Sequence, residues 1–382
     1  MSAETTHTNQ YTTIQPHLYM AFELSQSKWM LGFTIGFGQR ARLRSIAARD
    51  LVALQSEIHL ARERFGLAEE TEVISCYEAG RDGFWLHRYL SSIGVSNLVV
   101  DSASIEVNRR AKQAKTDKLD LGKLLTMLIR YDAGEKKVWR VVHVPSPDVE
   151  DHRHLHRELT DLKEQRTQHT NRIKGYLASQ GICLGKVKDD FPERIARQQL
   201  WNGEPLPAGL RARLLCEYER FQLVQQQIKT LEAERREALR HSTQPEVEQI
   251  RQLLHLRGIG INCAWLYVME FFSWRAFRNR REVGALAGLT PMPHRTGEED
   301  RELGISKIGN RHIRAMAIEI AWGWLRYQPN SELSRWYQRR FGKGSKRLHK
   351  IGIVALARKL LIAIWRYLEF GTVPTGAVLK ST

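Results

Sequence analysis

Apolar and polar residues follow two different periods along the first third of the chain. Short, nearly continuous apolar runs predict strands, and apolar residues that recur every three or four positions predict helices. Three predicted strands come first and then helices and strands alternate, which is the order of a mixed α/β sheet. In chain order, the predicted strands cover 18–22, 29–35, 40–46, 73–77 and 97–100, and the predicted helices cover 50–65, 83–93 and 116–131.

Two long segments rich in charged residues follow a boundary marked by Pro145 and Pro147, and they predict helices at about 149–180 and 209–240. Their narrow apolar seam predicts an antiparallel coiled-coil arm. The alternative is a helical hairpin that packs on its own domain. The rest of the chain is mostly helical in pattern, apart from a loop rich in Gly and Pro at 288–304.

These breaks divide the chain into five parts. The chain has 382 residues and 42% hydrophobic residues, which is enough for two or three domains with buried cores. In order, the parts are a disordered N-terminus (1–17), an α/β domain (18–147), the arm with an inserted loop (148–243), a mostly α C-terminal domain (244–373) and a frayed tail (374–382).

The charge balance indicates a polyanionic partner. Lys and Arg number 59 against 42 Asp and Glu, a formal net charge of +17. Neutralising phosphates and releasing their counterions drives the binding of such proteins to nucleic acid. We expect no membrane segment, because no apolar run is long enough to span a bilayer, and the polar N-terminus lacks the order of a signal peptide. We therefore expect the cytoplasm as the location.

Cysteine and histidine do not indicate a zinc site. The four cysteines are scattered without a CxxC pair and are expected to be buried thiols. His152, His154 and His156 alternate along a predicted helix, where positions two residues apart do not share a face.

Four carboxylates stand in an order that suggests a magnesium site. Glu23 and Glu78 follow apolar strands, and Asp117 and Asp120 lie three residues apart at the start of a helix that Thr116 can cap. Ligands of α/β sheets gather at the carboxyl ends of strands, and hard divalent cations take oxygen ligands. The alternative for the two aspartates is a surface pair that favours the helix dipole.

The C-terminal half carries candidate nucleic-acid contacts. The turn Gly258–Gly260 between apolar helices resembles a helix-hairpin-helix, whose backbone N–H groups can reach a phosphate; the alternative is a tight turn between packed helices. Basic residues with interleaved aromatic residues suit phosphate contacts and base stacking. The candidates around a Gly-Asn turn and beyond it are Lys307, Asn310, Arg311, Arg314, Arg340, Lys343, Lys346 and Arg347.

Five motifs occur in an order that resembles a known family. They are Tyr77–Gly80, Lys115–Asp120, Gly258–Gly260, Ala287–Pro291 and Gly304–Asn310. In this order they resemble the DEDD transposases of the insertion-sequence one-ten family, relatives of the Piv-type DNA invertases. The resemblance covers about residues 18 to 370.

The resemblance implies a RuvC-like (RNase H-like) N-terminal domain, a coiled-coil arm and a C-terminal transposase domain with a nucleophilic serine. It implies that this serine attacks the scissile phosphate and forms a covalent protein–DNA intermediate, assisted by Mg²⁺ at the acidic tetrad of another subunit. It further implies a structured non-coding guide RNA that pairs with donor and target DNA. A shared site requires an oligomer, and we expect a dimer that assembles to a tetramer on DNA.

Carried over residue by residue, Glu78, Asp117 and Asp120 fill the last three tetrad positions. Glu23 fills the first, where Asp is the commoner residue. Where the family has serine followed by glycine, this chain has Thr296 and Gly297. A threonine hydroxyl can be a nucleophile, although its methyl group restricts χ1. This leaves three alternatives. Thr296 serves as the nucleophile, Ser306 takes its place, or this copy of the enzyme is impaired.

Two other functions fit the same residues. A RuvC-like junction nuclease would hydrolyse DNA through metal-activated water, without a covalent intermediate. A non-catalytic descendant of a transposase would bind RNA and DNA, and this binding would be unaffected by Asp117→Ala.

Overall fold

The computed structural model describes residues 16–80, 83–105, 117–273, 275–296 and 299–380, with the side chains of 103, 117–118 and 293–303 left aside. The proposed cap residue Thr116 and nearly all of the expected disordered N-terminus lie outside the described residues. The chain forms two compact units. The first contains residues 1–144 and 274–276, and the second contains 145–273 and 277–382.

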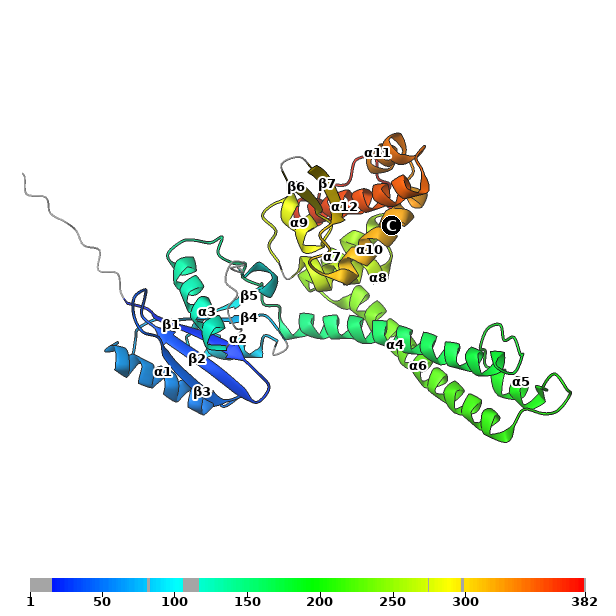
Figure 1. Ribbon diagram of the computed structural model, residues 1–382, viewed down its shortest axis with the longest axis horizontal. Coiled ribbons are helices and arrows are strands. Elements are labelled where there is room, and N and C mark those ends of the chain that lie inside the picture. The colour runs from blue at the N-terminus through cyan, green and yellow to red at the C-terminus, as the bar shows by residue number, and fades with distance from the viewer. Residues whose placement is uncertain (1–15, 81–82, 106–116, 274, 297–298, 381–382) are drawn as a thin grey trace, which may run out of the picture. The chain divides into compact units, whose positions relative to one another are not determined.

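The first unit is built on a five-stranded mixed sheet of order β3-β2-β1-β4-β5 (Figure 1). The strands β1 (Leu18–Leu24), β2 (Lys28–Thr34) and β3 (Arg42–Ala47) form an antiparallel meander, and β4 (Val73–Glu78) and β5 (Ser96–Val100) run parallel to β1. This arrangement confirms the predicted mixed α/β sheet.

Helices cover both faces of the sheet. The side chains of α1 (Leu51–Phe65) and α2 (Trp85–Ser92) pack with Met20, Phe22 and other strand residues in one apolar core. The helix α3 (Asp117–Asp132) packs on the opposite face in a second core. Successive side chains along a strand point to opposite faces, so both cores draw on the same strands.

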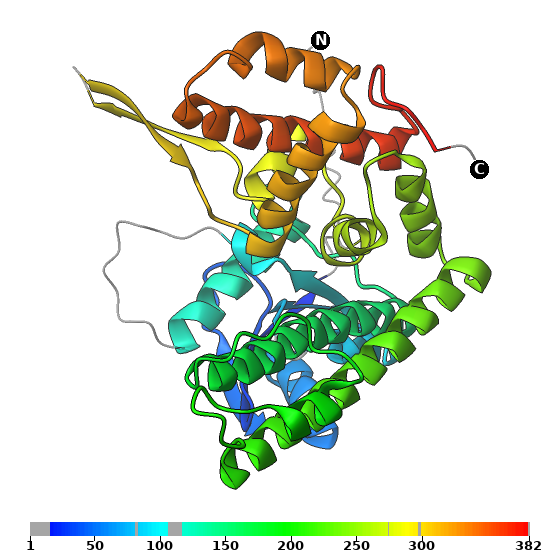
Figure 2. The ribbon, with the colours of Figure 1, turned by 90° about the vertical axis from the view of Figure 1, so that its right-hand side faces the viewer.

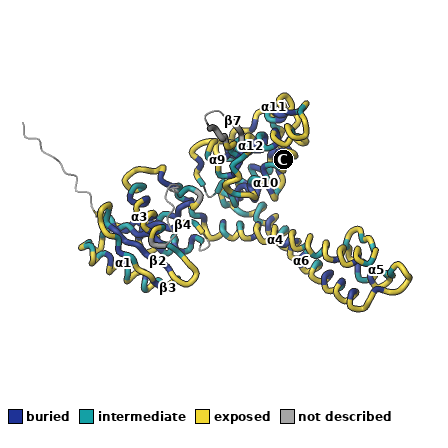
Figure 3. The backbone as a smooth tube through the Cα atoms, in the orientation of Figure 1, coloured by how far each residue is buried: buried dark blue, intermediate teal, exposed yellow. Residues whose placement is uncertain are grey.

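The second unit begins with two long antiparallel helices, α4 (Pro147–Ala178) and α6 (Ala208–His241). Leu159 and Leu162 of α4 pack with Val224 and Ile228 of α6. Beyond them, both helices and the short α5 (Phe191–Arg197) share a second apolar cluster. Exposed residues run along the outer sides of the pair (Figure 3). The predicted pair of antiparallel helices is confirmed.

The remainder of this unit is a helical module with one β-hairpin. Its largest core gathers apolar side chains from nearly every helix that follows α6. The elements are α7 (Pro245–His255), α8 (Ile261–Tyr267), the π-helix η2 (Val268–Phe272), α9 (Arg280–Leu286), β6 (Pro291–Thr296), β7 (Glu299–Ile305), α10 (Arg311–Tyr327), α11 (Glu332–Phe341) and α12 (Lys346–Phe370). No helix in the described part of the chain combines the length and apolarity needed to cross a bilayer.

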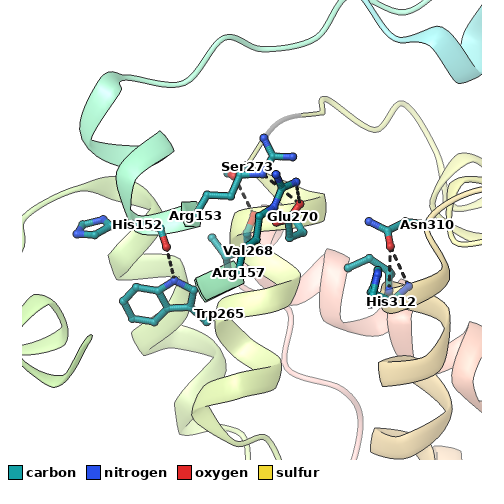
Figure 4. A network of polar contacts seen from close by, with 10 residues as sticks. His152, Arg153, Arg157, Trp265, Val268, Glu270, Ser273, Asn310 and His312 are labelled. Atoms are coloured by element: carbon teal, nitrogen blue, oxygen red, sulfur yellow. Dashed lines mark hydrogen bonds and ion pairs between the residues drawn. The ribbon is translucent and has the colours of Figure 1, made fainter. Parts of the chain in front are cut away.

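An ion-pair cluster around the nearly buried Glu270 joins α4 to this module (Figure 4). The carboxylate of Glu270 on the π-helix accepts from Arg157 Nε at 2.6 Å and from Arg153 Nε at 3.1 Å. The indole N–H of Trp265 donates to the carbonyl oxygen of His152 at 3.0 Å. Because Glu270 is largely removed from water, the two guanidinium groups that neutralise it fix where the helical pair leaves the module.

Two expectations were wrong in the second unit. The tail is not frayed, because Lys380 N donates to the His255 carbonyl at 2.7 Å and the buried Gln328 side chain bonds both the N–H and the carbonyl of Val378. The cysteines are not all buried. Cys76 and Cys263 are, while Cys216 is exposed on α6 and Cys183 is exposed in the segment between α4 and α5.

The buried imidazole of His156 on α4 makes stability depend on pH. Burial and, secondarily, the charge of Arg235 lower the pKa of His156 from 6.5 to about 4. Below pH 6.5 the unfolded chain takes up a proton that the folded chain refuses, so stability falls as the pH drops from 6.5 towards 4. We expect this group to remove about 2–3 kcal/mol over that interval.

The measurement is the free energy of unfolding by urea at pH 7.5 and pH 5. His156→Gln has no group that titrates there and is expected to lose less stability than the wild type. His154→Gln, an exposed position on the same helix, is the matched control and is expected to follow the wild type. Equal pH dependence in all three proteins would contradict the assignment.

Candidate functional site

Two glutamates lie side by side at the carboxyl ends of neighbouring parallel strands. Glu23 pairs with Met30 inside β1, so it belongs to the strand and does not follow it, and Glu78 is the last residue of β4. The register of Phe22 with Tyr77 makes Glu23 and Glu78 neighbours across strands that lie about 4.8 Å apart. By alternation, both share the sheet face covered by α3.

The helix α3 runs antiparallel to β1. Its last residue, Asp132, accepts a hydrogen bond at 2.8 Å from the hydroxyl of Tyr19 near the start of β1. Its fifth residue, Leu121, lies over the middle of the sheet, where a Cβ on Gly32 would stand 2.9 Å from Leu121 Cδ2. The first turn of α3 is therefore directed to the strand ends that carry the glutamates.

The backbone of this first turn, which begins at Asp117 and contains Asp120, lies towards the strand ends that carry the two glutamates. Gly32 pairs with Ala21, so Leu121 lies over Ala21, and Asp117 begins α3 about 6 Å earlier along the helix axis. Glu23 lies about 7 Å beyond Ala21 along the strand, in the same direction. The same argument applies one strand further on, because the carbonyl of Leu124 accepts from Cys76 Sγ at 4.0 Å. Asp120 precedes Leu124 by one turn, and Glu78 follows Cys76 by two residues.

The chemistry of this donor set fits a hard divalent cation. All four groups are carboxylates, Glu78 is exposed and makes no ion pair with a described residue, and among the described residues Asp120 pairs with Lys123 at 3.3 Å. An exposed pair of that kind contributes little and can be exchanged for a metal ion. Among the described side chains, which leave out Asp117, no three acidic, His or Cys groups already form a metal cluster.

A further carboxylate at this edge of the sheet was missed from the sequence. Asp101 directly follows β5, is buried, and pairs with Arg275 Nε at 3.3 Å. Arg275 belongs to residues 274–276, the segment by which the chain returns to the first unit. The run Val99-Val100-Asp101 carries the same signal as Cys76-Tyr77-Glu78, an acid at the end of an apolar strand. Because a guanidinium already neutralises it, Asp101 serves to hold this return segment.

The expected loop at 288–304 contains a β-hairpin instead, so that expectation was wrong. The strands β6 and β7 pair from Pro291 with Ile305 to Thr296 with Glu299. In Figure 2 they form a ribbon (yellow) that extends away from the helices of this unit. Pro and Gly misled the prediction, because Pro293 lies at an irregular point of the ladder, where a missing N–H is tolerated. Thr296 is the last residue of β6 and pairs with Glu299, the first residue of β7.

The two glycine motifs form the base of this hairpin. Lys307 N donates to the Gly288 carbonyl at 3.1 Å, and Asn310 N donates to the Leu286 carbonyl at 3.1 Å. Gly309 has φ +117°, and a Cβ there would lie 2.1 Å from the Leu286 oxygen. Only glycine allows the two backbones to come this close. The motifs Ala287–Pro291 and Gly304–Asn310 are thus a single structural feature that holds the hairpin.

Two of the predicted nucleic-acid contacts also hold this base. The Arg314 guanidinium donates to the carbonyl oxygens of Ala287 and Lys307 at 3.3 and 3.1 Å. The Asn310 side chain caps α10 and accepts from the N–H groups of His312 and Ile313 (Figure 4). Both side chains have structural partners, whatever further contacts they make.

Ser306 lies at the opposite end of the hairpin from Thr296. Ser306 N donates to the Thr290 carbonyl at 2.8 Å, so this serine stands at the base, about six residue steps from Thr296 along β6. That is about 20 Å at the rise of a strand. The two hydroxyls therefore cannot occupy the same position, and a DNA strand arranged for one is out of reach of the other.

The turn at Gly258–Gly260 joins α7 to α8 and is packed on by the C-terminal segment. Arg257 N donates to the Val378 carbonyl at 3.1 Å, Lys380 Nζ donates to the Ile259 carbonyl at 3.1 Å, and a Cβ on Gly258 would meet Tyr327 Cβ at 3.2 Å. These contacts describe a tight turn between packed helices. The remaining basic candidates are exposed, namely Lys307, Arg311, Arg340, Lys343, Lys346 and Arg347.

Comparison with known proteins finds similarity to transposases. The model of the transposase IS116/IS110/IS902 family matches residues 250–338, which include the hairpin and its base. A putative transposase, y4rJ, of Sinorhizobium fredii is 40% identical over 378 residues, or 95% of each chain. The transposase of insertion sequence element IS1328 from Yersinia enterocolitica is 28% identical over 61% of this chain and 68% of its own. That of IS1111A from Coxiella burnetii is 24% identical over 62% and 64%.

Two Gly→Ala changes on either side of α3 are expected to act in opposite directions. In Gly32→Ala the new methyl group would lie within 3.0 Å of Leu121 and Leu125, so the helix must move off the sheet at a cost of about 1–3 kcal/mol. In Gly122→Ala the methyl group meets nothing within 4 Å on the exposed side of α3 and stabilises the helix by about 0.5–1 kcal/mol. Urea unfolding measures both, and the same sign for both would refute the packing.

A second Gly→Ala pair tests the base of the hairpin. Gly309→Ala places a methyl group against the Leu286 carbonyl at a backbone angle that alanine avoids, and we expect a loss of at least about 2 kcal/mol. Gly323→Ala, inside α10 with nothing within 4 Å, is the control and is expected to be neutral or stabilising. Thermal unfolding compares them. A Gly309→Ala protein as stable as the wild type would contradict the close approach.

Proposed function

Because this chain belongs to the IS116/IS110/IS902 family of transposases and is a DNA transposase, we propose that it works through a covalent link between Thr296 and DNA. In this proposal, the enzyme cuts and rejoins the strands of an insertion sequence. The observation that carries it is the position of Thr296 at the far end of β6, in a projecting hairpin whose base is held by two family motifs. A hydroxyl in that position can reach a phosphate of the DNA backbone without any movement of the core.

The proposed chemistry is two successive transesterifications. The Thr296 hydroxyl loses its proton and attacks the scissile phosphorus, one P–O bond forms, and the P–O bond to the leaving strand breaks. The leaving oxygen takes a proton and becomes a free hydroxyl end. A hydroxyl end of another strand then attacks the Thr296 phosphodiester and restores the threonine. Each step exchanges one phosphodiester for another, so the strands are rejoined without an external energy source.

The acidic edge of the first unit is the proposed second half of the site. We assign Glu23, Glu78, Asp117 and Asp120 as the ligands that hold Mg²⁺. Bound there, Mg²⁺ would neutralise charge on the phosphate oxygens and stabilise the attacking and leaving oxygens. The strand order β3-β2-β1-β4-β5, with a meander followed by parallel strands, supports the assignment of residues 18–147 as a RuvC-like domain.

The proposed partners follow from charge and from the division of the site. A net charge of +17 supports binding of both donor and target DNA and of a structured non-coding guide RNA that selects them. The acidic edge and the hairpin belong to different units of the chain. We propose that the acidic edge of one subunit acts with Thr296 of another, in a dimer that becomes a tetramer on DNA. The helical pair of residues 148–243 offers the surface for this assembly.

A metal-dependent junction nuclease is the second candidate, and the threonine is the observation that favours it. The extra methyl group of Thr296 restricts χ1 and crowds an in-line approach. A nuclease would use the same carboxylates to activate water and would leave no protein on the DNA.

The nucleophile is tested on the full chain with labelled donor and target DNA, the RNA encoded beside the gene, and Mg²⁺. We expect a covalent protein–DNA adduct with the wild type and a larger yield with Thr296→Ser, because the methyl group is removed. We expect Thr296→Ala to abolish the adduct, and Asp117→Asn or Glu78→Gln to reduce product at least about 100-fold. Denaturing gel electrophoresis separates adduct from free DNA, and mass spectrometry identifies the linked residue.

Ser306→Ala is the matched control, because it removes the other hydroxyl of this region and is expected to retain the adduct. Strand cleavage that persists in Thr296→Ala without any adduct would establish the nuclease instead. Binding of DNA and RNA without any strand cleavage, unchanged in Asp117→Asn, would establish a non-catalytic protein.

A further inference from the structure

A groove of about 910 Å³ runs along the outer face of α12, from the base of the hairpin to α11 and the segment 372–375. Its floor is apolar, with Ile351, Val354 and Ile362 of α12, and Leu333 and Trp336 of α11. The three α12 residues follow one another at three and eight steps, so they form one stripe of the helix. A volume of this size lies at the upper end of the range of cavities that bind compact ligands.

The rim of the groove is strongly cationic. The first turn of α9 adds Arg280 and Arg281, and of the described residues that line the groove only Glu332 is acidic. No described carboxylate forms an ion pair with any of the cations that line it. The cations contributed by α12 are Arg347, Lys350, Arg358, Lys359 and Arg366. From Arg347 to Arg366 they extend over about 28 Å of helix.

Arg358 lies on this rim and forms no ion pair with a described carboxylate. Its Nε is buried and has no hydrogen-bond partner among the described residues. A Cβ on Gly284 of α9 would stand 2.9 Å from this nitrogen, so glycine leaves the room in which the guanidinium lies. A buried N–H of a charged group is costly without an acceptor. An anionic ligand in the groove would supply one.

We propose that this groove binds an unpaired segment of a nucleic-acid strand, with phosphates at the cationic rim and bases on the apolar floor. The inference rests on the proposed function for the class of ligand and adds where an unpaired strand is held and by which residues. The floor is continuous at one end with Pro291 and Gly304, the base of the hairpin that ends at Thr296. A strand held here is thus led to the hairpin.

The floor distinguishes an unpaired strand from a duplex. In a duplex the bases are stacked inside, so its backbone can meet the rim while the apolar floor stays uncovered. In an unpaired strand the flat faces of the bases are free to pack on Trp336 and on aliphatic side chains. Lys359 Nζ lies 4.7 Å from the centroid of the Trp336 ring, so a cation and an aromatic surface stand together at this point.

The test is fluorescence anisotropy with the full chain in EDTA, which removes divalent metal ions so that no strand is cut. The measurement reports binding alone. A negative result would therefore contradict the groove proposal without bearing on the proposed catalysis. The probes are a labelled twelve-residue oligo(dT), the matching oligo(U), the dT–dA duplex, and a strand of twelve abasic residues. We expect the unpaired strand to bind at least about tenfold more tightly than the abasic strand, because base packing is lost in the latter. We also expect it to bind more tightly than the duplex. The oligo(U) arm decides between RNA and DNA.

The groove is assigned with two double variants that remove the same charge. Arg358→Gln/Lys359→Gln is expected to weaken oligo(dT) binding at least about tenfold. The control, Lys229→Gln/Arg236→Gln, changes two exposed cations of α6 and is expected to weaken it less than threefold. Ile351→Ser, at a position 52% exposed and therefore safe for folding, is expected to weaken oligo(dT) but not the abasic strand.

Three results would overturn the proposal. One is equal loss in the groove and control variants. Another is equal affinity for abasic and thymidine strands, which would reduce the site to a phosphate contact. The third is tighter binding of a Glu- and Leu-rich amphipathic peptide than of any oligonucleotide, lost in the groove variant, which would assign the groove to a protein partner.

Discussion

The contact between Gly32 and Leu121 is the constraint on which the acidic edge depends. A helix that lies on a sheet can slide along it, and a slide of one turn would move its first carboxylates about 5 Å from the strand ends. The gap left by a missing Cβ in the middle of β2 accepts Leu121 and Leu125 and sets the helix at one position. Because Leu121 is fixed over Ala21, the first turn of α3 meets the ends of β1 and β4. Segments distant in sequence, the ends of two strands and the first turn of a helix, thus come to one edge, where the proposed ligands of Mg²⁺ lie.

A close approach at a glycine also fixes the hairpin, but there the glycine lies against backbone atoms and not against a side chain. Gly309 lets the chain pass against the Leu286 carbonyl, and the ladder bonds of Lys307 and Asn310 fix that approach. In both places a glycine fixes distance and register, and a polar group of proposed function stands several residues beyond. Close packing therefore occurs at the glycines, and the groups proposed to react lie several residues away, where they can remain exposed. It also explains why family motifs rich in glycine lie at the base of the hairpin, some distance from Thr296.

The sequence predicted most of the fold because periodicity reports burial. All five strands and the long helices were predicted correctly. Each presents an apolar face to a core, and that burial sets the spacing of its apolar residues. The β-hairpin was not found, because a projecting ribbon has no core to pattern it and its prolines suggested a loop. The order of the carboxylates suggested the acidic edge, but the helix direction that unites them depends on the Tyr19–Asp132 bond and on Gly32. Such contacts between distant residues leave no local signal, and neither did the groove on α12, whose apolar stripe looks like an ordinary core face.

The division of the chain has a consequence for how the proposed reaction is controlled. The proposed ligands of Mg²⁺ lie in the first unit and the proposed nucleophile lies in the second. Each half is held by a glycine contact within its own unit, Gly32 with Leu121 in the first and Gly309 with Leu286 in the second. In the proposed reaction, nucleic acid and a second subunit would therefore have to bring the two halves together. Cleavage would then wait until the strands to be joined are bound.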